Sequence, residues 1–190
     1  MISKFKKIKN YYGIKMSIYK FEKNIPKIGN NSYIYKSADI IGDVTIGENC
    51  YIGPGARIRG DYGTIKIGNN TAIEENVVIH ARPDDITNIG NYVTIGHASI
   101  IHNALIKDWA VIGMGAIVSD WATVGIWAVV AEGAVVKNKQ NIPDRNIAVG
   151  VPAKVVSEIS SEYEKQWTKY KKIYCDLAKT RLPNNLELIQ

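Results

Sequence analysis

The sequence predicts a mainly-β fold, a left-handed parallel β-helix of six-residue repeats, with one α-helix near the C-terminus packed along it. Three observations lead to this prediction. An aliphatic residue recurs every six residues, the next residue is often glycine (as in TIGENC and VIGMGA), and residues 155–177 change to apolar spacings of three and four. A period of six fits neither an amphipathic helix nor an alternating strand. It fits short strands on three flat faces, each contributing one inward aliphatic side chain.

The six-residue series covers most of the chain. Its members are Ile34, Ile40, Ile46, Ile52, Ile58, Ile67, Ile73, Ile79, Ile89, Ile95, Ile101, Ile106, Ile112, Val118, Val124, Val130 and Val136. Three hexapeptides make one coil, so these 17 positions predict about six coils, stacked at the strand spacing of about 4.8 Å. Helices of this hexapeptide type are left-handed, an exception to the right-handed crossover rule. A sandwich of short strands would not keep one residue class in phase for so long.

We expect one domain preceded by a short extension, since 190 residues suit a single core. Residues 1–15 are a basic extension, residues 16–150 are the β-helix domain, and residues 151–190 are the C-terminal helix and tail of the same domain. The apolar positions expected in that helix are Val155, Val156, Ile159, Tyr163, Trp167, Tyr170, Tyr174 and Leu177. Ser157 or Ser160 would cap the helix, which should end near Leu182 and Pro183.

Composition narrows the kinds of partner. The net charge of +6 lies largely at the two ends of the chain, where solvated lysines explain it better than nucleic-acid binding. Only Cys50 and Cys175 are present, which fits a reducing compartment. No signal-peptide core or membrane-spanning run is visible. We therefore expect a cytoplasmic protein without membrane or nucleic-acid partners, and we expect Trp121 and Trp127 to be structural turn residues.

The six-residue period breaks in three places. Between Ile58 and Ile67 there is an insertion of three that holds Gly60, Asp61 and Tyr62. A second insertion, of four, lies in HARPDDITN, and one residue is missing between the repeat positions 101 and 106. Insertions in a solenoid form surface loops, often on its functional face.

The chain's three histidines lie beside these breaks. His80 and His102 each follow an aliphatic repeat position, and these positions are three turns apart, which is one full coil. The two side chains should therefore stack on one edge of the prism. Arg59 occupies the same place one coil earlier and should lie beneath them.

His97 comes one turn before His102 and should lie around a different corner, directly above Glu75 and beside Glu74. A site with three histidines then requires a second subunit to supply its own His97, as cyclic packing of three copies would do. Three imidazoles with an open fourth position suit catalytic Zn²⁺, and Fe²⁺ or Co²⁺ can use the same ligands. A structural role for each histidine is the alternative.

The stretches RGDYGTIKIGNNTAIEENVVIHA and TIGHASIIHNALI resemble the γ-class carbonic anhydrases, a family with bacterial relatives described as transferases or as phenylacetate- and carnitine-associated proteins. The likeness runs from Met16 to about Leu182. It implies a homotrimer with Zn²⁺, or Fe²⁺ under anaerobic conditions, that converts CO2 reversibly to bicarbonate by attack of a metal-bound hydroxide. The implied ligands are His80 and His102 of one subunit and His97 of the next.

The same resemblance assigns further roles. Arg59 and Asp61 match the family's RGD motif, which supports the site and pairs the subunits electrostatically. Where the family usually has Gln-Asp, this chain has Glu74 and Glu75. Glu74 can accept a proton or serve as a base, and the longer Glu75 must pair with Arg59 across the interface in an altered geometry. Tyr174 matches a family tyrosine that can reach the active site, although packing in the core is the alternative for this residue.

Two other functions remain open at this point. One is acyl transfer or thioester hydrolysis with a coenzyme A substrate, although no histidine is left over as a general base once three bind metal. The other is a metal-binding structural trimer without activity, which the Glu74–Glu75 departure from the family pattern keeps open.

Overall fold

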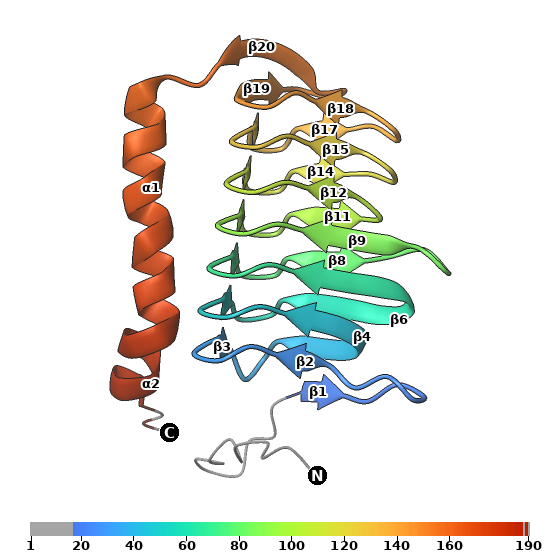
Figure 1. The fold of residues 1–190 in the computed structure, drawn as a ribbon, viewed down its shortest axis with the longest axis vertical. Coiled ribbons are helices and arrows are strands. Elements are labelled where there is room, and N and C mark those ends of the chain that lie inside the picture. Colours follow the sequence, from blue (N-terminus) through green and yellow to red (C-terminus); the bar gives the residue numbers. More distant parts are fainter. Residues whose placement is uncertain (1–16, 188, 190) are drawn as a thin grey trace.

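The computed structural model describes residues 17–187 and 189, and in it the chain winds into a left-handed parallel β-solenoid with one long helix beside it (Figure 1). This confirms the predicted fold class. The expected extension, residues 1–15, lies outside the described residues. None of the helices among the described residues is long and apolar enough to cross a membrane.

The solenoid has three faces, named here by what they carry. The helix face consists of β3 (Tyr33–Ile34), β5 (Tyr51–Ile52), β7 (Ala72–Ile73), β10 (Thr94–Ile95), β13 (Val111–Ile112), β16 (Val129–Val130), β19 (Asn146–Val149) and the antiparallel β20 (Lys154–Glu158). The histidine face consists of β1 (Ser17–Tyr19), the first parts of β4 (Asp39–Ile46) and β6 (Arg57–Ile67), β8 (Val78–His80), β11 (Ile100–His102), β14 (Ile117–Val118) and β17 (Val135–Val136).

The third face is built from the remaining strands. It consists of β2 (Lys27–Ile28), the second parts of β4 and β6, β9 (Ile86–Ile89), β12 (Leu105–Ile106), β15 (Thr123–Val124) and β18 (Asn141–Ile142). Strands β4 and β6 bend around a corner and join the histidine and third faces into one sheet.

The predicted number of coils was one too low. All 17 positions of the six-residue series are buried, but the helix face holds seven parallel strands, from β3 to β19. Ile142 and Ala148 are fully buried and continue the series in the same phase. The count stopped at Val136 because Pro143 follows the next aliphatic residue and the position after that is a small alanine. Burial, rather than the branched side chain, defines the series.

The predicted insertion of three residues is also present. Gly42 pairs with Gly60 and Val44 pairs with Ile65, so one residue of β4 faces four residues of β6. The extra residues bulge out of the strand pairing beside His80, next to the candidate site.

The corners turn through left-handed backbone. Along one corner an amide ladder, Asn31–Asn49–Asn70, is followed one coil at a time by the aromatic residues Tyr92, Trp109 and Trp127. The aromatic rings stack with centroids 4.2 and 4.9 Å apart. Trp127 and, at another corner, Trp121 have φ of 57°, which bulky residues rarely adopt. Both tryptophans are thus turn residues, and ring stacking helps to hold Trp127 in that conformation.

The C-terminal helix begins after the second of the two predicted capping residues. Helix α1 (Ser161–Asp176) is capped by Ser160, whose hydroxyl accepts a hydrogen bond from the Tyr163 backbone N–H at 3.1 Å. A π-helical turn (Leu177–Arg181) and α2 (Leu182–Asn185) follow. Val155 and Val156 were predicted to be helical, but they lie in β20. This segment pairs with β19 before the helix starts.

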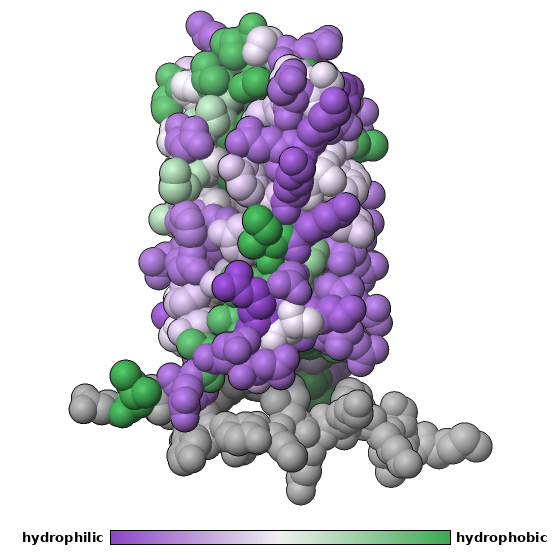
Figure 2. Space-filling model, turned by 90° about the vertical axis from the view of Figure 1, so that its left-hand side faces the viewer, coloured by the Kyte–Doolittle hydropathy of each residue, from purple (hydrophilic) through white to green (hydrophobic). Residues whose placement is uncertain are grey.

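Helix α1 returns along the helix face in the direction opposite to the growth of the solenoid (Figure 1). Tyr163 and Trp167 pack near the upper coils, while Tyr174 and Leu177 pack on the lower ones. Tyr170 was expected on this apolar side but is 44% exposed. The outward surface of this side of the molecule is mainly hydrophilic (Figure 2). Helix α1 thus covers the helix face and leaves the histidine and third faces uncovered (Figure 1).

Lys171 is the one charged side chain that α1 buries. Its ammonium group donates hydrogen bonds to Thr94 Oγ1 and the Ala110 carbonyl, each at 3.1 Å, and lies 5.5 Å from the Trp167 ring centroid. Burial lowers the pKa of Lys171 to about 7. Lys171 thus ties the middle of α1 to β10.

Candidate functional site

The site is built around two histidines that stack on the edge where the histidine face ends. His80 and His102 pair in register across β8 and β11, and Arg59 pairs with His80 one coil below. The imidazole centroids are 5.2 Å apart, and His80 Nδ1 lies 3.2 Å from His102 Nε2. The stack expected from the repeat phase is therefore present.

Each stacked histidine has a carboxylate on its other ring nitrogen. His80 Nε2 lies 2.9 Å from Asp61 Oδ1, and His102 Nδ1 lies 2.5 Å from Asp120 Oδ1. An arginine holds each carboxylate in turn, with Arg59 2.5 Å from Asp61 and Arg82 2.7 Å from Asp120. The result is one chain of contacts that fixes both rings.

The two carboxylates are held in their charged form. Burial raises the pKa of Asp61, but hydrogen bonds from His80 and Arg59 outweigh it, so the pKa lies below the usual value. The hydrogen bond from Arg82 lowers the pKa of Asp120, and the contact with His102 lowers it further against the effect of burial. Both groups are therefore hydrogen-bond acceptors at neutral pH.

His97 lies at the corner before β11 and contacts the two glutamates predicted beneath it. Its Nδ1 is 2.5 Å from Glu75 Oε2, and its Nε2 is 3.2 Å from Glu74 Oε2. The His97 backbone N–H also donates to Glu74, whose side chain is 8% exposed. The structure thus groups His97 with the glutamates, apart from the His80–His102 stack.

Two tyrosines support this acidic corner. The Tyr51 hydroxyl donates a hydrogen bond to Glu75 Oε1 at 2.6 Å, and the Tyr174 ring lies 5.4 Å from the Tyr51 ring. Burial raises the pKa of Tyr174, as does its hydrogen bond to Glu74. Tyr174 therefore both packs against the helix face and contacts a candidate catalytic carboxylate.

In this single chain the predicted partners Arg59 and Glu75 each have another contact. Arg59 pairs with Asp61, and Glu75 pairs with Tyr51 and His97. Burial raises the pKa of Glu75, but the hydrogen bond from Tyr51 and the His97 contact bring it below the usual value. A contact between Arg59 and Glu75 would belong to an interface between two copies.

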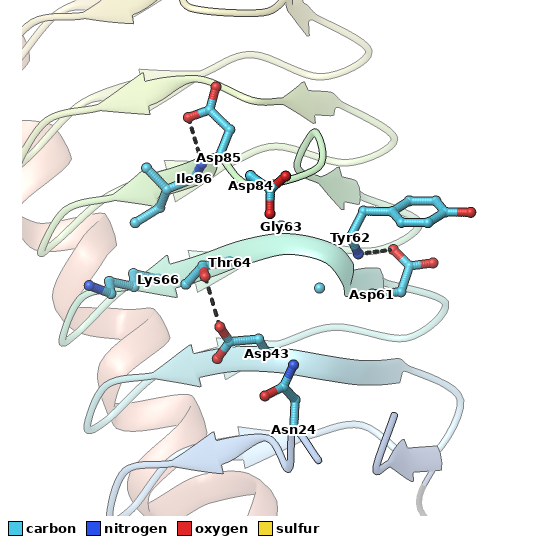
Figure 3. Close-up of a pocket in the computed structure, with 11 residues that line it drawn as sticks. Asn24, Asp43, Asp61, Tyr62, Gly63, Thr64, Lys66, Asp84, Asp85 and Ile86 are labelled. Carbon is cyan, nitrogen blue, oxygen red and sulfur yellow. Dashed lines mark hydrogen bonds between the residues drawn. The ribbon is translucent and has the colours of Figure 1, made fainter. Parts of the chain in front are cut away.

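A polar groove of about 450 Å³ lies beside Asp61 (Figure 3). Asp43, Asp84 and Asp85 also line it, with Tyr62 at its rim. Asp43 accepts a hydrogen bond from Thr64 at 2.7 Å, and Asp85 accepts hydrogen bonds from Asn103 and Trp121 that hold its own turn. These carboxylates therefore shape the inserted loops next to the site.

The histidine pair has the geometry of two ligands of one metal ion. Two Zn–N bonds of about 2.0–2.1 Å at a tetrahedral angle place their nitrogens roughly 3.3 Å apart. The observed separation of His80 Nδ1 and His102 Nε2 is 3.2 Å. Metal-bound imidazoles usually donate their second N–H to a carboxylate, as Asp61 and Asp120 allow here. The donor set therefore fits a zinc-type ion.

The described part of a single chain does not complete such a site. No group of three or more His, Cys, Asp or Glu side chains among the described residues is placed to hold a metal ion. The stacked pair alone supplies two of the nitrogens that such a site would need. His97 lies apart from the stacked pair, and each of its ring nitrogens has a carboxylate neighbour, Glu75 on Nδ1 and Glu74 on Nε2.

Sequence reasoning missed Asp120 and Arg82. Ile101 pairs with Val118 and Ile106 pairs with Val124, so four residues of the lower coil face five of the upper one. Asp120 lies in this longer stretch, and its side chain reaches down to His102. The missing residue beside His102 was the available signal, but the repeat phase alone does not show where a side chain extends.

Comparisons with known proteins identify the family to which the chain belongs. A model of bacterial transferase hexapeptides (six repeats) matches residues 25–60. The chain is 34% identical to γ carbonic anhydrase 2 of Arabidopsis thaliana mitochondria over 87% of its own length, and it spans 61% of that relative. It is 36% identical to the carnitine operon protein CaiE of Escherichia coli K12, with 86% of this chain and 83% of that protein covered.

Among solved structures, a hexapeptide transferase family protein from Anaplasma phagocytophilum superposes with a TM-score of 0.82. The two are 31% identical, with 86% of this chain and 96% of the other covered. The chain therefore belongs to the hexapeptide-repeat family that includes the γ carbonic anhydrases and the carnitine operon protein CaiE.

Proposed function

We propose that this protein is a metal-dependent γ-type carbonic anhydrase, which interconverts CO2 and bicarbonate at sites between the subunits of a homotrimer. One observation carries the proposal. His80 and His102 present nitrogens 3.2 Å apart and each has a carboxylate behind it, while His97 is held outward on another corner. The proposed reaction is that of the plant relatives named as γ carbonic anhydrases. The chain spans about 60% of the length of these relatives.

The trimer is supported by the surface between the two histidine edges. Val78, Ile100, Ile117 and Val135 occupy successive outward positions on the histidine face, and Val78 and Ile100 are each 40% exposed. This apolar strip lies between the edge that carries His80 and His102 and the corner that carries His97. Its exposure fits burial against a second copy. Cyclic symmetry then gives three equivalent sites.

The metal would be held by His80 and His102 of one subunit and His97 of the next, with Zn²⁺ preferred and Fe²⁺ or Co²⁺ as alternatives. Such an ion supplies a water of lowered pKa and a positive charge for the developing bicarbonate. Asp61 and Asp120 orient the two rings and keep the facing nitrogens available.

Glu74 is the proton acceptor in this proposal. Its carboxylate lies 3.2 Å from His97 Nε2, so it would be close to an ion held by that nitrogen. Tyr174 lies close to the same carboxylate, which raises the pKa of the Tyr174 hydroxyl beyond the effect of burial. Arg59, with Asp61, lies at the opposite edge, where it pairs with Glu75 of the next subunit and brings the two half-sites together.

Stopped-flow CO2 hydration tests the function. Protein prepared anaerobically, with metal counted per subunit, should show activity that rises in proportion to metal content and disappears in the His102→Ala variant. A fully metal-loaded trimer without CO2 hydration would rule out the proposal.

One observation favours a second candidate, acyl transfer from a coenzyme A thioester. His102 and Asp120, 2.5 Å apart, also have the form of a general base with an orienting carboxylate. A metal chelator separates the two functions, because acyl transfer by this pair would persist under chelation whereas CO2 hydration would stop.

A further inference from the structure

Two vertical rows of side chains border the histidine face, one at each edge. We call the first the presenting row; it contains Glu75, His97, Met114 and Glu132. Backbone hydrogen bonds link its successive corners, from Ala98 to Glu75, from Gly115 to His97 and from Gly133 to Met114. Each residue therefore lies one coil above the one before it.

The second, receiving row contains Arg59, His80, His102, Ser119 and Lys137. Strand pairing sets this order, since Arg59 pairs with His80 and His80 with His102. The pairs Ile101–Val118 and Val118–Val136 then place the next residues, Ser119 and Lys137, one and two coils above His102.

The proposed shared site fixes how two copies meet along these rows, and the inference that follows rests on it. A closed ring is generated by rotation alone, without translation along the axis. With the solenoid parallel to that axis, residues at equal heights above the site face each other. His97 and His102 lie in the same coil, so Glu132 and Lys137, each two coils higher, lie at one level, roughly 10 Å above the site.

We propose that Glu132 of one subunit pairs with Lys137 of the next, and that this second contact favours the closed trimer over staggered pairings of two copies. Both side chains are exposed, and neither forms an ion pair with another residue in the described part of the chain. The order of charged side chains and histidines along one row also matches that along the other. Acidic Glu75 and Glu132 bracket the presenting histidine, and basic Arg59 and Lys137 bracket the receiving ones.

Met114 lies between these levels. Its side chain is 53% exposed. One coil above His97, it would lie one level above His102 of the neighbouring copy and opposite Ser119 of that copy. An apolar side chain there closes the upper side of the shared site against water. Two copies displaced by one coil would form an open, staggered assembly, in which Met114 faces Lys137 and Glu132 lies beyond the end of the receiving row. The charged pair therefore favours the closed ring over that assembly.

Charge exchange tests the pair. In Glu132→Lys the new cation faces Lys137, and in Lys137→Glu the new anion faces Glu132. Each single variant should raise the dissociation constant of the trimer at least about tenfold, because like charges then meet at every interface. The double exchange, Glu132→Lys with Lys137→Glu, should restore association. Sedimentation equilibrium measures this in low and high salt, and circular dichroism checks that each subunit is folded.

Matched controls come from α1, which lies along the helix face and on which Glu162 and Lys172 are exposed. Glu162→Lys and Lys172→Glu should leave association unchanged. The inference is overturned if Glu132→Lys associates like Glu162→Lys, or if the double exchange is no better than the single variants. A wild-type protein that is monomeric with metal bound would instead refute the shared site itself, and thus the proposed function.

Discussion

Nδ1 of His102 lies 2.5 Å from Oδ1 of Asp120, and the other oxygen of Asp120 accepts a hydrogen bond from Arg82 at 2.7 Å. The contact fixes both the orientation of the ring and the position of its N–H, because Nδ1 must donate to a charged acceptor. Nε2 is then left with a free lone pair that faces His80. Asp120 thus acts on the site through His102, as a positioning residue.

Asp120→Asn should weaken metal binding about 10- to 100-fold, the range found when the outer partner of a metal-bound histidine is changed. The amide keeps the shape of the side chain but loses the charge that holds Nδ1–H. Competition with a coloured chelator measures this directly. Asp144→Asn, at an exposed corner without a histidine, is the control; equal affinities for both variants would show that Asp120 does not position His102.

His97→Ala should leave the solenoid folded but remove the third ligand. His97 is 46% exposed and its backbone hydrogen bond to Glu74 survives the substitution, so loss of the ring contacts with Glu74 and Glu75 should lower the free energy of unfolding by only about 1 kcal/mol. Metal content per subunit should fall sharply while the denaturant midpoint stays near that of Lys172→Ala. Full metal retention in His97→Ala would contradict a site shared between subunits.

Glu74→Gln should move the pH profile of CO2 hydration toward lower pH. The amide oxygen can still accept the hydrogen bond from the His97 backbone, but one negative charge beside the site is lost. A nearby anion disfavours loss of a proton from a neighbouring group, so its removal lowers the pH at which the active form appears. The measurement is kcat/KM from pH 5 to 9, and an unchanged midpoint would place Glu74 outside the proton-transfer chemistry.

Lys171 should make stability depend on pH. Its pKa is about 7 in the folded protein because of burial, and near 10.4 when unfolded. Between these values the unfolded chain binds more protons, so the free energy of unfolding should rise as pH increases from about 7 to 10. Lys171→Met preserves length and should remove this slope, while changing stability at pH 7 by less than about 1.5 kcal/mol. Urea unfolding at several pH values checks this, and a slope that persists in the variant would assign it to other groups.

The repeat phase predicted those contacts that depend on backbone register. Counting turns placed His80 beneath His102 and His97 above Glu75, because strands in neighbouring coils pair residue for residue. It did not predict the Asp120 contact, which depends on a side chain reaching across a corner with unequal numbers of residues. The start of the helix was misjudged at Val155 and Val156 because edge pairing to β19 decided that segment, and apolar spacing carries no information on such pairing.

Helix α1 changes how the stack of coils can come apart. In a repeat protein each unit normally contacts only its neighbours, so the ends can fray and domains of different stability can melt one after another. Here one helix contacts Val129 near the top of the stack and Tyr51 near the bottom, with Lys171 tied to Thr94 between them. Separation of any middle coils therefore also strips the helix from its neighbours. We therefore expect the chain to unfold in a single cooperative transition rather than to fray gradually from its ends.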